Sequence, residues 1–329
     1  MKQDVDNRPA PDAGRLRRLI LARGTVDRAS ARRDDEDWLT AAWADPGTRV
    51  LVLDDAQAMV RFGRGNAELM FLPPAEAPEG IRFLLGVDED GAAYFGLAGA
   101  PGGLGAGSTP SAGASPMLPP EPGLRPAGLR QAAPLLSDRD AGLFTHAVAL
   151  AHWHASHTHC PRCGERTVVL AAGHARRCPA DGSDHFPRVD PAVIMLVTDD
   201  ADRCLLARNQ RWPGRRVSIL AGFVEPGESV EHSVRREVME ETGLSVSEIS
   251  YVGSQPWPMP QSLMLGFTAR AAGRQEIRVD EEEIAEARWF SRQELHDAVT
   301  GGEVLLPPPV SIAHRIIESW YGGVLTGSW

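Results

Sequence analysis

Three glutamates at helical spacing give this chain its clearest capacity for chemistry. Glu237, Glu240 and Glu241 occur at positions i, i+3 and i+4 of the segment GFVEPGESVEHSVRREVMEETGL, residues 222–244. At about 100° per residue, a helix would place the three carboxylates within roughly a 100° arc. Like charges at this spacing repel, and their pKa values rise without a counter-ion. Mg²⁺ removes that cost and is commonly shared between carboxylates and phosphates, so the spacing predicts a metal site that binds a phosphate-bearing substrate.

The neighbouring residues predict the elements that position this cluster. Ser229 is a good N-cap and Gly243 is a good residue just past a helix end, so we expect the helix to lie between them. The preceding loop, residues 222–227, contains glycines that allow close approach of the backbone.

An arginine inside the segment can order the carboxylates. Arg236 stays protonated and can hold a carboxylate with two hydrogen bonds, and Glu228 and Glu237 are the two candidates. The alternative interpretation of the whole segment is an acidic, solvated helix.

The cysteines indicate a second metal site. The chain has four, Cys160, Cys163, Cys178 and Cys204. Because the N-terminus shows no export signal, the paired cysteines favour metal binding over disulfides. Cys204 lies in a strand-like pattern and is expected in the core.

Composition limits the function classes. The chain has 329 residues, 24% charged residues and a net charge of −10, which argues against a broad nucleic-acid-binding face. No apolar run approaches the length of a membrane span. We therefore expect a cytoplasmic protein.

The pattern along the chain predicts five parts. Short apolar runs separated by turns indicate a small β-rich domain over residues 1–98. Residues 99–123, rich in Gly, Ala and Pro, indicate a flexible insertion, and residues 124–155 a connecting helical segment. The cysteine segment covers residues 156–188. Strands and helices then follow over residues 189–329 in an order that suits a layered α/β/α domain.

The segment over residues 222–244 resembles the Nudix box, with every fixed position present. The resemblance implies a Nudix α/β/α sandwich. It also implies that Glu237, Glu240 and Glu241 hold Mg²⁺ or Mn²⁺, with Arg236 and Glu228 in the catalytic set. Water would then attack a pyrophosphate phosphorus.

Two further segments resemble one branch of that family, the NADH pyrophosphatases. The sequence SQPWPMPQS, residues 254–262, is similar to the signature of this branch, with Met259 in place of the usual phenylalanine. The cysteine segment resembles its zinc ribbon, which precedes the Nudix domain and has the pattern CxxC…CxxC.

The ribbon departs from the family pattern, because Asp181 replaces the fourth cysteine. Three alternatives follow. Asp181 supplies the fourth Zn²⁺ ligand, His185 supplies it, or zinc is lost and three reduced cysteines remain. A cluster of histidines near the end of the preceding helix could also serve, although such a cluster is more often solvated: His152, His154, His157 and His159.

The resemblance to this branch assigns further roles. Phe186 and Phe223 occupy positions where two aromatic rings sandwich the nicotinamide-side base. Glu283 matches a carboxylate that assists metal or substrate binding. The remaining substrate-binding positions are Gln255, Trp257, Ser262 and Ala313.

The resemblance implies a homodimeric enzyme that hydrolyses NADH to reduced nicotinamide mononucleotide and AMP. NAD⁺ and NAD-capped RNA are the related substrates. The alternatives are another Nudix nucleoside-diphosphatase, such as one of the ADP-ribose type, and a non-catalytic Nudix-like ligand sensor.

Overall fold

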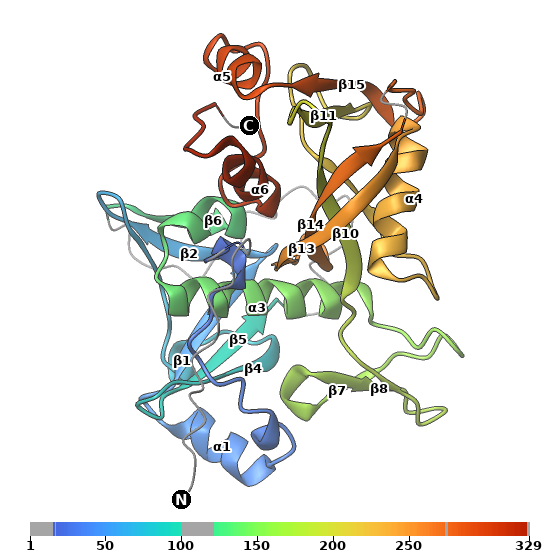
Figure 1. The fold of residues 1–329 in the computed structure, drawn as a ribbon. Helices are drawn as coiled ribbons and strands as arrows, with labels where there is room; N and C mark the ends of the chain where they lie inside the picture. The colour runs from blue at the N-terminus through green and yellow to red at the C-terminus, as the bar shows by residue number, and fades with distance from the viewer. Residues whose placement is uncertain (1–15, 17, 100–121, 274–275, 328–329) are drawn as a thin grey trace, which may run out of the picture. The chain divides into compact units, whose positions relative to one another are not determined.

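The structure, a computed structural model, describes residue 16 and residues 18–99, 122–273 and 276–327, which form two compact units (Figure 1). The C-terminal unit comprises Pro191–Gln255 and Met264–Trp329, with the described residues before Ile20. The N-terminal unit comprises Ile20–Asp190 and Pro256–Leu263. The predicted insertion lies, from residue 100 to 121, outside the described residues. The predicted boundaries between the five parts stay a prediction.

The C-terminal unit is built on a sheet of six strands with the order β13-β14-β10-β11-β15, in which β12 also pairs with β10. Its strands are β10 (Asp190–Thr198), β11 (Cys204–Asn209), β12 (Leu220–Phe223), β13 (Ser245–Trp257), β14 (Ser262–Ala272) and β15 (Ile284–Phe290). Its helices are α4 (Val230–Thr242), α5 (Arg292–Thr300) and α6 (Ile312–Tyr321).

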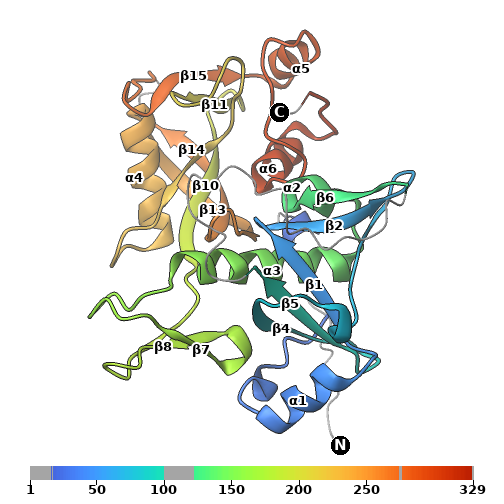
Figure 2. The same ribbon diagram turned by 180° about the vertical axis from the view of Figure 1, so that it is seen from behind.

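Alternating side chains explain why helices cover both faces of this sheet. Along β10, Val193 and Met195 belong to a buried cluster that includes Val238 of α4. Between them, Ile194 belongs to a second cluster that includes Ile316 of α6. Successive strand residues point to opposite faces, so both faces are apolar. Figures 1 and 2 show α4 and α6 on opposite sides of the sheet, which confirms the predicted α/β/α sandwich.

The N-terminal unit contains the predicted β-rich domain. Its main sheet has six strands, with the order β3-β2-β1-β5-β4 and β6 on β2. These strands are β1 (Arg49–Asp54), β2 (Gln57–Phe62), β3 (Ala67–Leu69), β4 (Ile81–Val87), β5 (Ala93–Ala98) and β6 (Leu124–Gly128). The helices are α1 (Glu36–Ala44), α2 (Leu129–Ala132) and α3 (Asp138–Ser156).

Helices α1 and α3 both pack on this sheet. Leu84 of β4 and Phe95 of β5 form a buried cluster with Leu39 of α1. The neighbouring Phe83 stacks on the imidazole of His154 in α3, with ring centroids 5.9 Å apart. Helix α3 also contacts β1 and β5, so the 124–155 segment is an integral layer of this unit as well as a connection.

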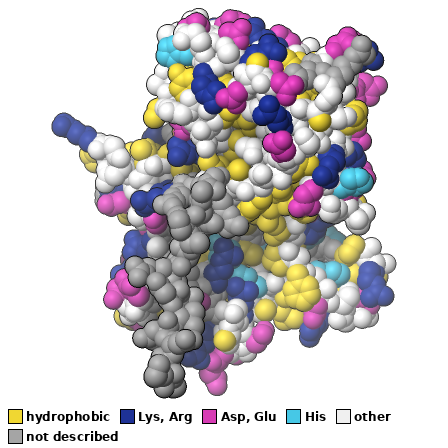
Figure 3. Space-filling model, viewed as in Figure 1, with side chains coloured by type: hydrophobic (Ala, Val, Ile, Leu, Met, Phe, Trp, Pro, Cys, Tyr) yellow, Lys and Arg dark blue, Asp and Glu magenta, His cyan; other side chains and the backbone are white. Residues whose placement is uncertain are grey.

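The cysteine segment forms a small sheet with the order β7-β8-β9. The strands are β7 (Val168–Leu170), β8 (Ala175–Arg177) and β9 (Asp184–His185). Single 3₁₀ turns complete the secondary structure at Ile20–Ala22, Ser30–Arg32, Pro74–Glu76, Ala133–Leu135 and Ala171–Gly173. No helix among the described residues is both long and apolar enough to cross a membrane. Acidic and basic side chains are interspersed on the face shown in Figure 3.

Candidate active site and metal centres

Helix α4 has the boundaries that the caps predict. The side chain of Ser229 accepts a hydrogen bond from the His232 N–H, and Gly243 ends the helix in the left-handed conformation with φ 70°. The packing of Val234 and Val238 in the buried cluster under α4 fixes the rotation of the helix relative to the sheet. As a result Glu237 and Glu241 face the protein and are buried, whereas the side chain of Glu240 is 56% exposed.

Arg236 donates hydrogen bonds to three glutamates and to a backbone carbonyl around helix α4. Its Nε and Nη2 atoms donate to the two carboxylate oxygens of Glu228, each at 2.9 Å. Its Nη1 atom donates to Glu237 at 2.8 Å and to Glu240 at 2.9 Å. Its Nη2 atom also donates to the Phe223 carbonyl at 2.9 Å. The two-bond pairing predicted for Arg236 is therefore made with Glu228, while Glu237 takes a single bond.

The hydrogen bonds of Arg236 change the pKa values of both partners. Its hydrogen bonds lower the pKa of Glu228 to about 2, so Glu228 is ionised at neutral pH. The same bonds raise the pKa of Arg236 itself. The result is an ion pair between Arg236 and Glu228 that is charged at neutral pH and holds the loop that precedes α4.

Gly222 of β12 explains the need for glycine before the helix. A β-carbon at this position would overlap the carboxylate of Glu237. The backbone of β12 therefore leaves a space that the Glu237 carboxylate occupies. Val193 of β10 pairs with Gly222, which anchors that strand in the sheet.

Within the cluster, the ionised form of Glu241 is the most strongly disfavoured. It is 7% exposed, and its Oε2 atom is buried without a hydrogen-bond partner. Burial, together with the charges of Glu237, Glu283 and Glu240, raises its pKa to about 8. Burial also raises the pKa of Glu237, against the lowering effect of Arg236. A buried acceptor among like charges fits a divalent cation, because a cation supplies the missing partner and the missing counter-charge.

Glu283 reaches this cluster from a distant part of the sequence. The Arg278 N–H donates to the Thr242 carbonyl at 2.8 Å and the Asp280 N–H to the Glu241 carbonyl at 3.3 Å, so this segment follows the end of α4. The Glu283 carbonyl accepts a bond from the Gln210 N–H at 2.8 Å. The charge of Glu283 acts on Glu237 and Glu241, which places this predicted residue with the box carboxylates.

The ribbon contains two similar turns that bring its ligand atoms together. Cys160 and Cys163 lie on one turn, and Cys178 and Asp181 lie on the other. In each turn the following glycine has a positive φ and donates a hydrogen bond back to the first cysteine carbonyl, Gly164 at 2.9 Å and Gly182 at 3.0 Å. Asp181 therefore occupies the position that corresponds to Cys163.

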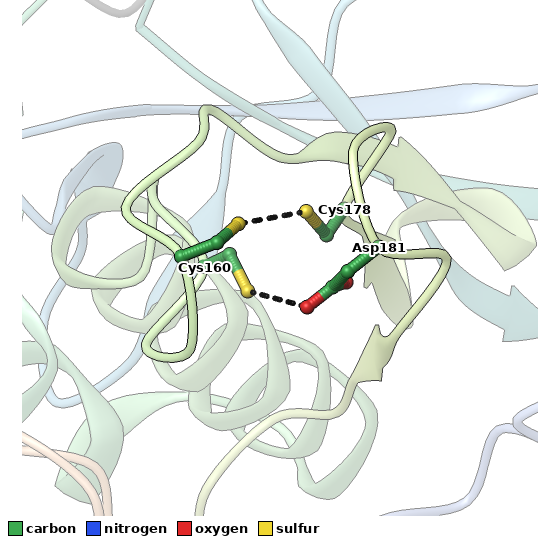
Figure 4. A group of neighbouring side chains, drawn as sticks. Cys160, Cys178 and Asp181 are labelled. Atoms are coloured by element: carbon green, nitrogen blue, oxygen red, sulfur yellow. Dashed lines mark hydrogen bonds between the residues drawn. The ribbon is translucent and has the colours of Figure 1, made fainter.

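The four ligand atoms of Cys160, Cys163, Cys178 and Asp181 lie within 4.8 Å of one another. Figure 4 shows Cys160, Cys178 and Asp181 pointing toward a common centre. Zinc–sulfur bonds of about 2.3 Å in a tetrahedron require sulfur atoms roughly 3.8 Å apart, so the set fits Zn²⁺. His185 instead lies with its Nε2 atom 3.2 Å from the Ser183 hydroxyl. The geometry thus favours the aspartate alternative.

The thiols of the ribbon differ in acidity. Burial acts to raise the pKa of Cys160, but hydrogen bonds from the Arg162 N–H and the Ser183 hydroxyl lower it to about 6. Burial raises the pKa of Cys178 to about 11. Metal binding to this set would release protons, because zinc takes thiolates as ligands.

The interpretation of the nearby histidines as solvated is wrong for His154, while His152 is partly exposed but hydrogen-bonded. His154 is buried, and its Nε2 atom bonds the Gly173 carbonyl at 2.9 Å. The Nδ1 atom of His152 bonds the Pro258 carbonyl at 2.7 Å. Their partners are 19 and 106 residues away, so no local pattern in the sequence could have indicated them.

The other predicted substrate residues are divided between the units. Phe186 is 66% exposed in the N-terminal unit, and Phe223 is 60% exposed in the C-terminal unit. Neither ring is core, but their predicted sandwich stays a prediction. Gln255 is buried, and its amide donates to the Val310 carbonyl at 3.0 Å while its Oε1 atom has no partner. Ala313 is buried in α6, and Trp257 and Ser262 are partly buried.

The sandwich fold and the carboxylate-bearing helix define a class, the Nudix hydrolases. A family model described as NUDIX domain matches residues 188–307. The NADH pyrophosphatase zinc ribbon domain matches residues 155–186. The NADH pyrophosphatase-like rudimentary NUDIX domain matches residues 47–153. One solved structure, a NUDIX hydrolase from Nitrosomonas europaea, aligns with a TM-score of 0.40 and 19% identity over 52% of this chain and 97% of its own.

Two related proteins indicate which branch of the Nudix hydrolases the chain resembles. The chain is 39% identical over 314 residues to the NAD-capped RNA hydrolase NudC of Mycobacterium tuberculosis, covering 92% of this chain and 94% of the relative. It is 35% identical over 341 residues to the NAD-capped RNA hydrolase NUDT12 of Homo sapiens, covering 90% of this chain and 71% of the relative. The chain therefore belongs to the Nudix hydrolases, in the NADH pyrophosphatase family.

Proposed function

We propose that this chain is a metal-dependent NAD(H) diphosphatase that releases nicotinamide mononucleotide and AMP, and that it also removes NAD caps from RNA. The main support is the similarity over nearly the full length to relatives named NAD-capped RNA hydrolases. The box carboxylates add the chemical means, since they gather around a buried acceptor that has no partner.

Four carboxylates would hold the catalytic cation, Glu237, Glu240, Glu241 and Glu283. Bound Mg²⁺ or Mn²⁺ would supply neutralisation of the diphosphate charge and activation of water. Arg236 keeps Glu228 ionised and fixes the carboxylate of Glu237 through a hydrogen bond.

In the ribbon, Cys160, Cys163, Cys178 and Asp181 would hold one Zn²⁺ with a structural role, because four protein ligands leave no open position. For the substrate, Phe186 and Phe223 would stack on the nicotinamide-side base. A homodimer and a cytoplasmic location are part of the same proposal.

The direct test uses the full chain with NADH and Mn²⁺ or Mg²⁺, with products separated by chromatography. We expect AMP and reduced nicotinamide mononucleotide in equal amounts. The same preparation is then given NAD⁺, ADP-ribose and NAD-capped RNA. Glu240→Gln serves as the control, and loss of one metal ligand should lower the rate about a hundredfold or more, equivalent to about 3 kcal/mol.

Each alternative has a distinct result. Faster hydrolysis of ADP-ribose than of NADH would replace the proposal with the ADP-ribose class. Binding of NAD(H) without release of AMP would favour the non-catalytic sensor. Full activity of Glu240→Gln would overturn the assignment of the carboxylates.

A further inference from the structure

Side chains of α2 and α3 contact the proline-tryptophan loop, residues 256–261, whose last residue, Gln261, is also bonded to the Asp190 carboxylate at 2.7 Å. His152 of α3 places its Nδ1 atom 2.7 Å from the Pro258 carbonyl and 3.3 Å from the Pro260 carbonyl. Arg130 of α2 lies with its guanidinium carbon 5.2 Å from the centre of the Trp257 ring. Its Nε atom also donates to the sulfur of Met259 at 3.2 Å.

The composition of the loop makes these contacts important. Proline has no N–H, so Pro258 and Pro260 can be held only through their carbonyl oxygens. Both carbonyls face the same imidazole nitrogen, which must therefore carry the proton. Within the loop, the Met259 N–H donates to the Trp257 carbonyl at 2.7 Å. One imidazole donor thus contacts the carbonyl oxygens of two of the six residues.

Helix α3 presents His152 from a fixed position. Two residues further on, His154 bonds the Gly173 carbonyl and accepts a bond from Arg176 at 2.9 Å. Arg176 is 4% exposed and also donates to the side chain and carbonyl of Thr167. The end of α3 is therefore tied to the ribbon, and a donor on such an element is pre-organised.

We propose that His152 and Arg130 are positioning residues that shape the 256–261 loop and thereby set the preference for NADH over ADP-ribose. The inference rests on the proposed function and on the expectation, from the family resemblance, that Trp257 contacts the substrate. The box carboxylates belong to the other unit, so a change in this loop should affect recognition of the base and leave hydrolysis of the diphosphate largely unchanged.

The test compares three substitutions of His152. Asparagine places an amide N–H near the position of imidazole Nδ1, glutamine places it further out, and leucine has no donor. Loss of one hydrogen bond should lower kcat/KM for NADH about tenfold, mainly through KM, while ADP-ribose hydrolysis changes about twofold or less. We expect this result for His152→Leu and His152→Gln, and near wild-type behaviour for His152→Asn.

Two further variants separate positioning from general damage. Arg130→Ala alters an exposed side chain, so the fold should persist, and it should shift the substrate preference in the same direction. His157→Leu is the matched control at the end of α3. The Nδ1 atom of His157 is hydrogen-bonded to the hydroxyl of the adjacent Ser156 and not to the 256–261 loop. Its substrate preference should equal that of the wild type.

Several outcomes would overturn the inference while leaving the proposed function intact. These are equal losses on NADH and ADP-ribose, failure of asparagine to restore the preference, or no effect of either His152→Leu or Arg130→Ala. Absence of NADH hydrolysis by the wild-type chain would instead remove the proposed function itself.

Discussion

Replacing Glu241 by glutamine should stabilise the protein in the absence of Mg²⁺ and Mn²⁺, and this gain should grow with pH. The carboxyl group is 7% exposed, has an oxygen without a partner, and has a pKa raised from 4.5 to about 8. Between these two values the folded protein binds the proton more tightly than the unfolded chain does. The free energy of unfolding therefore falls as pH rises from 4.5 to 8.

The size of the effect follows from the same numbers. At about 1.4 kcal/mol per pH unit, Glu241 lowers the free energy of unfolding by about 3 kcal/mol at pH 7 and by about 5 kcal/mol above pH 8. These values are upper limits, since an opened site admits water. Glutamine is neutral at every pH and removes this contribution while retaining the shape of the side chain.

The assay is urea-induced unfolding followed by tryptophan fluorescence at pH 5, 7 and 8.5, without added Mg²⁺ or Mn²⁺. The quantity of interest is the difference between variant and wild type, because other titrating groups then cancel. Glu240→Gln is the matched control, since the Glu240 side chain is 56% exposed and no buried charge is removed. We expect a difference that grows with pH only for Glu241→Gln.

Addition of Mn²⁺ should reduce the stability difference between Glu241→Gln and the wild type. At a metal concentration a hundred times Kd, the wild type gains about 2.7 kcal/mol, and a variant that lacks a ligand gains less. Both variants should lose most NADH hydrolysis. A difference that stays constant from pH 5 to 8.5 would refute the reasoning, because Glu241 would then carry no desolvated charge.

Three other perturbations have defined outcomes. Acid should destabilise the fold between pH 6.5 and about 4, because burial lowers the pKa of His154 and of His174 from 6.5 to about 4 and the unfolded chain takes up protons first; unfolding midpoints at pH 7.5 and 5 measure this. Elemental analysis should find one zinc per chain, and Cys178→Ser should lose it and increase hydrogen exchange in the ribbon; zinc-free protein with an ordered ribbon would contradict this. Phe186→Ala and Phe223→Ala should each lower kcat/KM for NADH about tenfold and that for ADP-ribose far less; equal losses would mean a structural role.

Local features of the sequence were sufficient to predict helix α4 and its carboxylates. Ser229 and Gly243 are capping signals within a few residues of the helix, and the spacing of the glutamates is a helical period. Arg236 was also assigned to nearby carboxylates correctly, although the structure connects it to Glu240 as well. Capping residues and residue spacing can be recognised in the sequence without knowledge of the tertiary fold.

The contacts of α3 could not be predicted in this way. His152 and His154 belong to a histidine-rich stretch that resembles a solvated helix end. Their partners, the Pro258 and Gly173 carbonyls, are backbone atoms that carry no sequence signal. Arg176 is buried without a carboxylate partner among its hydrogen bonds, which contradicts the usual expectation for an exposed arginine.

The predicted metal-binding carboxylates and the predicted substrate-binding loop belong to different units of the chain. Residues 237, 240, 241 and 283, which supply the carboxylates, all belong to the C-terminal unit, whereas the ribbon and the 256–261 loop belong to the N-terminal unit. Chemistry on a diphosphate needs the first set, but a diphosphate is common to NADH and ADP-ribose. Discrimination therefore requires contacts to the rest of the substrate, and the loop is held by α3, which is also bonded to the ribbon through Arg176. If His152 has the proposed role, the ribbon would influence substrate choice by fixing the helix that presents His152, although it would hold no substrate itself.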